Sequence, residues 1–191
     1  METKSIMIVG VGGQGTLLAS KLLGHLLMEQ GYDVKVSEVH GMSQRGGSVV
    51  TYVRFGDKVY SPVIDKGQAD FIVSFELLEA ARWTSYLKPQ GKIIVNTQQI
   101  NPMPVIIGAA EYPENLAQKM VDAGLNVDAM DALSLAEQAG NAKAVNLVLM
   151  GRLSRYFDIP EEEWMVAIEQ SVPPKFLELN KKAFTLGRDA G

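Results

Sequence analysis

A glycine-rich turn near the start of the chain could bring backbone amides against an anion. Gly10, Gly12 and Gly15 satisfy the pattern G-x-G-x-x-G, with Gly13 and Gln14 between the last two glycines. In such a turn the first glycine allows a tight bend, the second lets a phosphate approach the backbone, and the third lets a helix pack on a strand. Unpaired N–H groups of the following helix would point at the same place. We therefore expect Gly10, Gly12, Gly13, Gln14 and Gly15 to bind a cofactor, the alternative being a turn that only connects a strand to a helix.

A second glycine-bounded loop, residues 40–47, carries three polar side chains, those of Ser43, Gln44 and Arg45. Glycines allow positive φ, and consecutive N–H groups in such a loop can form an anion-binding concavity. Arg45 could bind a carboxylate or a phosphate through two parallel hydrogen bonds. We expect Ser43, Gln44, Arg45 and Gly46 to contribute to cofactor binding, the alternative for Arg45 being a subunit contact or loop packing.

Few other residues in the chain could carry chemistry. Glu38 stands close to the position at which a dinucleotide fold places the acidic residue that binds a ribose hydroxyl. His40 could be an acid, a base or a donor, but no serine or acidic partner at triad spacing accompanies it, and His25 is expected to be structural or exposed. Glu76 and Glu79 follow an expected strand, where crevice residues occur, although acids are also common at helix starts. No catalytic residue is assigned, and two histidines without a cysteine predict no metal site.

Composition limits the classes of function. With 191 residues, 47% of them hydrophobic and 21% charged, the chain is expected to form a single domain, residues 1–191. The net charge of -4 gives no basic surface, so no nucleic-acid partner is expected. No apolar run reaches the length of a membrane span, and glycines interrupt the N-terminal apolar stretch, which argues against a signal peptide. The absence of cysteine excludes disulfides and cysteine-bound iron–sulfur clusters in this chain and favours a cytoplasmic location.

The elements that must position these loops alternate between strands and helices. The pattern predicts an α/β, Rossmann-like fold with a mostly parallel, doubly wound sheet, a β-hairpin insertion and a helical C-terminus. Strands are expected at residues 4–9, 33–39, 69–75, 92–96, 103–108 and 126–131, with a hairpin of 48–55 and 58–64. Helices are expected at residues 16–30, 76–87, 113–123, 133–139, 142–157, 160–171 and 174–187.

The two glycine motifs at this spacing resemble one family. Residues 9–15 followed by residues 37–49 look like the gamma-type subunit of 2-oxoacid:ferredoxin oxidoreductases. The fuller form of the second motif is most similar to the small (beta) subunit of indolepyruvate ferredoxin oxidoreductases. The likeness extends through residues 69–71, the turn at Glu76 and residues 146–151, and so covers nearly the whole chain as one gamma-type catalytic domain.

The resemblance implies a reaction that this chain cannot perform alone. Complexes of this family oxidatively decarboxylate 2-oxoacids to acyl-CoA, reduce ferredoxin, and use thiamine diphosphate and iron–sulfur clusters. This chain lacks cysteine, and it has no Gly-Asp-Gly followed by paired asparagines of the thiamine-diphosphate type. The resemblance therefore implies that both cofactors sit on a larger partner subunit, with CoA as co-substrate of the complex. An arylpyruvate such as indolepyruvate is the implied substrate; pyruvate, branched-chain 2-oxoacids and a direct contact of this chain with CoA stay open.

Two other functions are compatible with the motifs. A free-standing nicotinamide-dependent oxidoreductase would use Glu38 on the ribose, but the chain lacks a Tyr/Lys pair at helical spacing for hydride transfer. The third possibility is a non-enzymatic nucleotide-binding or assembly module.

Overall fold

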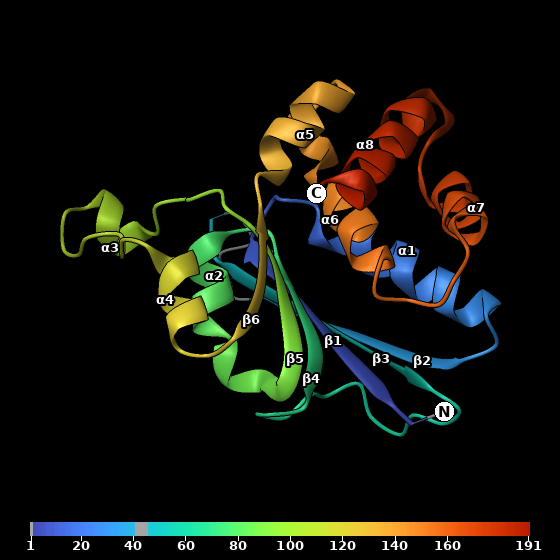
Figure 1. Cartoon of the computed structure of the whole chain (residues 1–191), viewed down its shortest axis with the longest axis horizontal. Coiled ribbons are helices and arrows are strands. Elements are labelled where there is room, and N and C mark those ends of the chain that lie inside the picture. Colours follow the sequence, from blue (N-terminus) through green and yellow to red (C-terminus); the bar gives the residue numbers. More distant parts are fainter. Residues whose placement is uncertain (1, 41–45) are drawn as a thin grey trace.

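A six-stranded sheet with helices on both faces forms the computed structural model, which describes residues 2–40 and 46–191 (Figure 1). In spatial order the strands are β2 (Asp33–His40), β3 (Ser48–Gly56), β1 (Lys4–Val11), β4 (Ala69–Ser74), β5 (Leu87–Asn96) and β6 (Asn126–Met130). β1, β4, β5 and β6 pair in parallel in that order, whereas β3 is antiparallel to both β1 and β2. The expected α/β fold with a mostly parallel sheet is therefore confirmed.

Helices cover both faces of the sheet (Figure 1). One face carries α1 (Thr16–Glu29), α5 (Ala132–Ala139), α6 (Val145–Ser154), α7 (Glu161–Ser171) and α8 (Leu177–Asp189), and the other carries α2 (Leu77–Arg82) and α4 (Leu116–Asp122). Single turns of 3-10 helix, η1 (Thr84–Tyr86), η2 (Ala142–Ala144) and η3 (Pro174–Phe176), precede β5, α6 and α8. Within the described residues, no helix has the length and apolar character needed to cross a membrane.

The central strand β1 divides the hydrophobic core in two. Ile6 and Ile8 pack with α1 and the four C-terminal helices on one face, whereas Met7 and Val9 pack with α2 and α4 on the other. All four side chains are fully buried, because successive side chains of a strand point to opposite faces and helices cover both. This double burial explains why residues 6–9 are apolar without interruption, as a strand in a parallel sheet requires.

The expected hairpin of residues 48–55 with 58–64 is wrong in its second strand. Residues 58–64, all of them described, form no strand. Because β3 pairs with β1 on one side and with β2 on the other, its backbone has no free edge for a third strand. The guanidinium of Arg54 instead donates to the carbonyls of Ser61 and Val63, at 3.0 and 2.9 Å. The antiparallel pair that interrupts the parallel sheet therefore consists of β2 and β3.

The strand expected at residues 103–108 is also wrong, because this segment begins with the short helix α3 (Met103–Ile106). Pro102 is its N-cap, and Pro104 lies in its first turn. Proline lacks an N–H group and fixes φ near −65°, which suits the first turn of a helix and not a strand ladder. Strand β5 also begins at Leu87, so the helix expected at residues 76–87 is shorter than predicted.

The last helix is held against α6 by direct backbone contact. A Cβ atom added at Gly151 of α6 would lie 2.0 Å from the carbonyl oxygen of Phe184 in α8. A Cβ atom added at Gly187 of α8 would lie equally close to the carbonyl oxygen of Val148 in α6. Each glycine therefore permits the approach of the other helix, and neither tolerates a side chain while the helices keep this separation.

We predict that Gly151→Ala lowers the free energy of unfolding by about 3 kcal/mol, because the backbone of α8 must move to admit the methyl group. Gly24→Ala in α1 is the matched control, since its Cβ atom would meet only Val36 at 3.5 Å. The control should raise stability by about 0.5–1 kcal/mol. Urea unfolding of the two variants checks this, and equal stability would show that α6 and α8 do not touch through their backbones.

Candidate functional site

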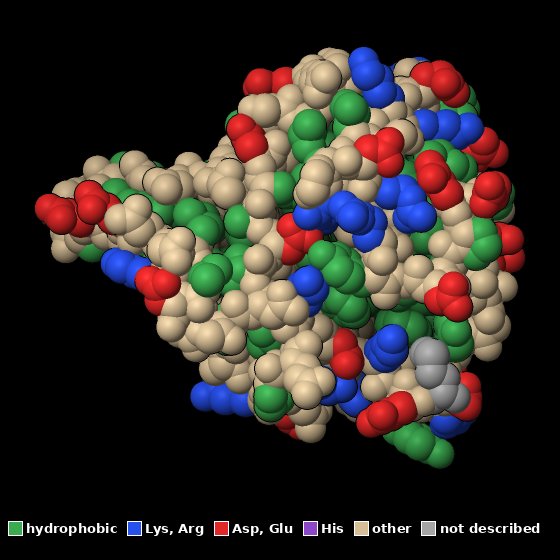
Figure 2. Space-filling view, viewed as in Figure 1, with side chains coloured by type: hydrophobic (Ala, Val, Ile, Leu, Met, Phe, Trp, Pro, Cys, Tyr) green, Lys and Arg blue, Asp and Glu red, His purple; other side chains and the backbone are tan. Residues whose placement is uncertain are grey.

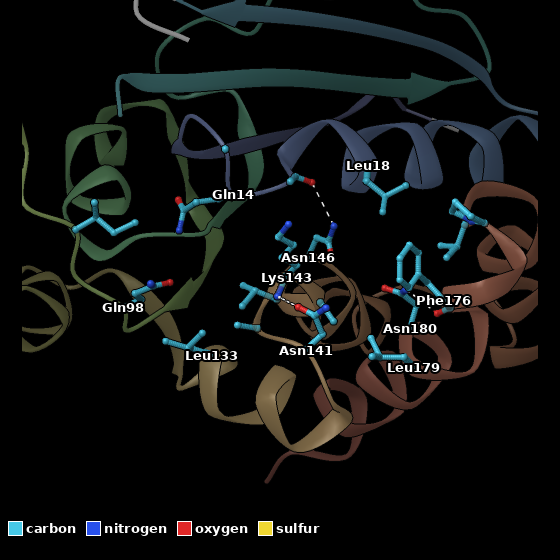
Figure 3. Close-up of a pocket in the computed structure, with 18 residues that line it drawn as sticks. Gln14, Leu18, Gln98, Leu133, Asn141, Lys143, Asn146, Phe176, Leu179 and Asn180 are labelled. Carbon is cyan, nitrogen blue, oxygen red and sulfur yellow. Dashed lines mark hydrogen bonds between the residues drawn. The ribbon is translucent and has the colours of Figure 1, made fainter. Parts of the chain in front are cut away.

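A cavity opens beside two neighbouring parallel strands whose following helices cover opposite faces of the sheet. β1 leads into α1 on one face, whereas the adjacent β4 leads into α2 on the other. In open α/β sheets ligands bind at such a switch point, beyond the carboxyl ends of the strands. The cavity has a volume of about 540 Å³, and Gly13, Gln14 and Gly15 of the loop after β1 form part of its wall (Figure 3).

The glycine loop has the geometry that its motif predicts. Gly13 and Gly15 have φ values of 102° and 90°, and Gly15 is the N-cap of α1. A Cβ atom at Gly10 would come within 3.0 Å of Phe75, so the first glycine allows the strand to pack closely. The N–H of Gly12 donates to the carbonyl of Gly47 at 2.9 Å. The two glycine motifs therefore meet through their backbones, whereas their expected role in cofactor binding stays a prediction.

The side chain of Gln14 is bonded to the protein at both ends. Its Oε1 accepts from the N–H of Val11 at 2.8 Å, and its Nε2 donates to the carbonyl of Phe75 at 3.0 Å. Asn96, fully buried at the end of β5, donates to the same carbonyl at 3.1 Å and accepts from the N–H of Ala132 at the start of α5. These carboxamides join the carboxyl ends of β1, β4 and β5 to the helix that follows β6. Gln14 therefore shapes the floor of the cavity.

The rest of the cavity wall comes from the C-terminal third of the chain. Asn146 and Asn180 are 5% and 8% exposed, and Figure 3 shows both directed at the space beside the glycine loop. Asn146 reaches the carbonyl of Gly15 at 3.5 Å. The apolar lining comes from the side chains of Leu18, Leu133, Val145, Val172, Phe176 and Leu179. No motif marked these positions in the sequence, and only the likeness at residues 146–151 touched one of them.

The positively charged side chain of Lys143 lies at the opening of the cavity. Lys143 lies in η2, is exposed, and forms no ion pair with any residue that the structure describes. Asn141 caps this turn by accepting from the N–H of Lys143 at 2.9 Å. An ammonium group, polar carboxamide side chains and an apolar wall together suit a ligand with an anionic end and an apolar or aromatic end.

Only part of the second glycine motif can be placed. Gly46 has a φ of 77°, and its N–H approaches the carbonyl of Gly12 at 3.5 Å. Ser43, Gln44 and Arg45 lie outside the described residues, so their expected role in binding stays a prediction. Directly after the motif, the hydroxyl of Ser48 donates to a carboxylate oxygen of Glu79 at 2.5 Å.

The two acidic residues after β4 have structural partners. Glu76 is 1% exposed and caps α2, accepting from the N–H of Glu79 at 2.8 Å. Its other oxygen accepts from the N–H of Ile100 at 3.0 Å and from the hydroxyl of Tyr112 at 2.5 Å. Burial, with the hydrogen bond to Glu76, holds the pKa of Tyr112 well above its ordinary value, so its hydroxyl stays a donor. Glu79 is paired with Arg82 at 3.3 Å.

The remaining candidates do not join the site. Glu38 is exposed on β2, and antiparallel β3 separates this strand from β1. A dinucleotide fold places its ribose-binding acid on the strand next to β1, so this arrangement does not favour nicotinamide binding. His25 contacts Gln170 of α7, which agrees with a structural role. The backbone of His40 ends β2. Among the described residues, no three histidine, aspartate or glutamate side chains are grouped as metal ligands would be.

Comparison with known proteins gives consistent matches over the whole chain. A family model described as pyruvate ferredoxin/flavodoxin oxidoreductase matches residues 5–190. The chain is 46% identical to the indolepyruvate oxidoreductase subunit IorB of Thermococcus kodakarensis, and the match covers 98% of this chain and 95% of that protein.

Solved structures share the fold. The pyruvate oxidoreductase subunit PORC of Thermotoga maritima is similar with a TM-score of 0.75 at 22% identity, covering 99% of this chain and 97% of that one. A 2-oxoglutarate:ferredoxin oxidoreductase of Magnetococcus marinus, solved with 2-oxoglutarate, coenzyme A and succinyl-CoA bound, gives a TM-score of 0.74 at 19% identity. That match covers 98% of this chain and 31% of the other. At these identities the likeness establishes the fold.

The close contact between the glycine loop and Asn146 can be tested by two substitutions. Gly13→Ala and Gly15→Ala both force alanine into a positive φ, at a cost of about 1–2 kcal/mol. At Gly13 the new methyl group meets open space, whereas at Gly15 it lies 2.9 Å from Nδ2 of Asn146. We predict that Gly15→Ala lowers unfolding free energy by about 1 kcal/mol more than Gly13→Ala in urea titrations. Equal losses would contradict a fixed position for Asn146.

Proposed function

The chain belongs to the pyruvate ferredoxin/flavodoxin oxidoreductase family, and we propose that it is the small subunit of a 2-oxoacid:ferredoxin oxidoreductase complex. The complex would oxidatively decarboxylate its 2-oxoacid, transfer the acyl group to CoA and pass the electrons to ferredoxin. The observation that carries this proposal is the 46% identity, over almost the full length of both chains, to an indolepyruvate oxidoreductase subunit.

An arylpyruvate, and indolepyruvate first, is the proposed substrate. The indolepyruvate oxidoreductase subunit is 46% identical to this chain, whereas the pyruvate oxidoreductase subunit is 22% identical. Both cover nearly the whole chain, so the difference does not come from partial matches. The difference favours an aromatic over a small aliphatic 2-oxoacid.

The larger partner subunit would hold thiamine diphosphate and the iron–sulfur clusters. This chain has no cysteine to bind a cluster, and its described part groups no three acidic or histidine side chains for the metal ion that accompanies thiamine diphosphate. Its residues therefore do not fit either cofactor. The small subunit would contribute a binding surface at the edge of the active site, and no redox step would take place on it. This division of roles is consistent with a cytoplasmic complex.

CoA is the proposed occupant of the cavity beside the glycine loop. CoA supplies the thiol that accepts the acyl group, and it carries phosphates at one end of a long, partly apolar molecule. The open space at Gly13, the first turn of α1 and the ammonium group of Lys143 suit phosphates. Leu18 and Phe176 supply apolar surface in the same cavity. These residues would bind and orient CoA.

The first test is activity with and without the partner. We predict no 2-oxoacid- and CoA-dependent reduction of ferredoxin or of a viologen dye by this chain alone, because it has no cysteine to bind an iron–sulfur cluster. Addition of the larger subunit should give turnover, with indolepyruvate used in preference to pyruvate. Turnover by the isolated chain, or an equal rate when it is omitted from the complex, would contradict the proposal.

The second test separates ligand approach from loop structure. In Gly12→Ala the N–H that donates to Gly47 is retained, while the added methyl group should block a phosphate. We predict that the complex binds CoA at least tenfold more weakly, with a thermal stability of the isolated chain close to native. Gly24→Ala, remote from the cavity in α1, is the control and should bind CoA normally. Reduced stability with normal CoA affinity would show that the loop is only structural.

A further inference from the structure

A seventeen-residue segment projects from the sheet, and of its hydrophobic side chains only that of Tyr112 packs against the core. Residues 97–113, here called the arm, connect β5 to the region before α4, and they are all described. Not one of them is buried. Met103, Ile106 and Ile107 are 64%, 65% and 68% exposed. Figure 1 shows α3 at the far end of the projection, and Figure 2 shows it as an extension of the molecular surface.

The arm is held in a defined shape despite its exposure. Both of its ends are bonded to one buried oxygen atom of Glu76, through the N–H of Ile100 and the hydroxyl of Tyr112. At the tip, the N–H groups of Ala109 and Ala110 both donate to the carbonyl of Pro104, at 2.8 and 3.1 Å. Ordered loops of this length that lack a core of their own are usually functional. The arm is therefore preorganised, which reduces the entropy lost on binding a partner.

The composition of the arm indicates a protein partner. Its single charged residue is Glu111, although charged residues make up 21% of the chain. Exposed isoleucine and methionine side chains gain free energy only when another apolar surface covers them. Such a surface differs from the polar, charged surface that favours transient contacts or ionic ligands.

We propose that the arm is a docking element that inserts its apolar tip, Met103–Ile107, into the larger subunit of the complex. This inference rests on the proposed function, because that function requires a larger subunit. The root of the arm lies at the cavity: Gln98 and Ile100 form part of the cavity wall. A subunit that supplies the cofactors must approach this same edge of the sheet, and in doing so it meets the arm.

A second copy of this chain is a less suitable occupant. A stable interface takes about 800 Å² and roughly 20–30 residues from each partner. A symmetric contact confined to two arms would use fewer residues than this on each side. The larger subunit would reach the required area, because it would cover the rim of the cavity together with the arm.

The test introduces charge at the tip and at a matched surface elsewhere. The arm variant combines Ile106→Asp with Ile107→Asp. The control variant combines Met28→Asp in α1 with Val166→Asp in α7, where the replaced side chains are 55% and 46% exposed. Ile106→Asn with Ile107→Asn repeats the arm variant without adding charge. Biolayer interferometry measures the affinity of each for the cofactor-loaded larger subunit, and thermal unfolding measures the stability of each isolated chain.

We expect both arm variants to bind the larger subunit at least 100-fold more weakly than the wild type, with native thermal stability, and the control to bind normally. Binding of the arm variants with wild-type affinity would overturn the docking proposal and leave the proposed function intact. If the isolated wild-type chain is a dimer and the arm variants are monomers that still bind the larger subunit normally, the occupant is a second copy, which also overturns the proposal. Failure of the wild type to bind the larger subunit would contradict the proposed function itself.

Discussion

A chain of carboxamide hydrogen bonds fixes the part of the molecule on which the site depends. Gln14 and Asn96 both donate to the carbonyl of Phe75, and Asn96 also accepts from the N–H of Ala132. Neighbouring parallel strands must separate at this edge because their helices cover opposite faces, and the separation leaves backbone groups without sheet partners. The carboxamides satisfy those groups, since an unpaired buried carbonyl would cost about 1–3 kcal/mol. The cavity floor is therefore rigid, and its shape follows from the crossing of the chain at β1 and β4.

The sequence was most predictive where burial on both faces dictates residue type. Residues 6–9 could be recognised as a central strand because a doubly covered strand must be apolar throughout. Residues 58–64 form no second hairpin strand because a hairpin signal in the sequence is local, whereas pairing depends on which strand edges are free, and β3 has none. The strand expected at residues 103–108 is replaced by a short helix, because prolines suit its first turn, and Met103, Ile106 and Ile107 face solvent. Apolar character alone therefore does not establish burial within the chain.

In the candidate site, too, the sequence predicts local geometry but not contacts between residues far apart in the chain. Both glycine motifs could be recognised in the sequence, and the bond from Gly12 to Gly47 shows that they meet in the fold. Lys143 and Asn180 could not be anticipated, because their place beside the loop depends on how the C-terminal helices pack. That packing is set by the backbone contact of Gly151 with Phe184 and of Gly187 with Val148. A motif reports local geometry, but the opposite wall of a cavity is decided by contacts between residues far apart in the sequence.

We infer that the carboxyl edge of the sheet, with its cavity and its arm, is the face that the larger subunit covers. Hydrogen exchange of the backbone amides, measured by mass spectrometry on the chain alone and in the assembled complex, tests this directly. We expect slower exchange in residues 97–113 and 141–146 on assembly, and unchanged exchange in α7. Slower exchange in α7 and the outer face of α1, with residues 97–113 unchanged, would place the larger subunit on another surface and contradict this assignment.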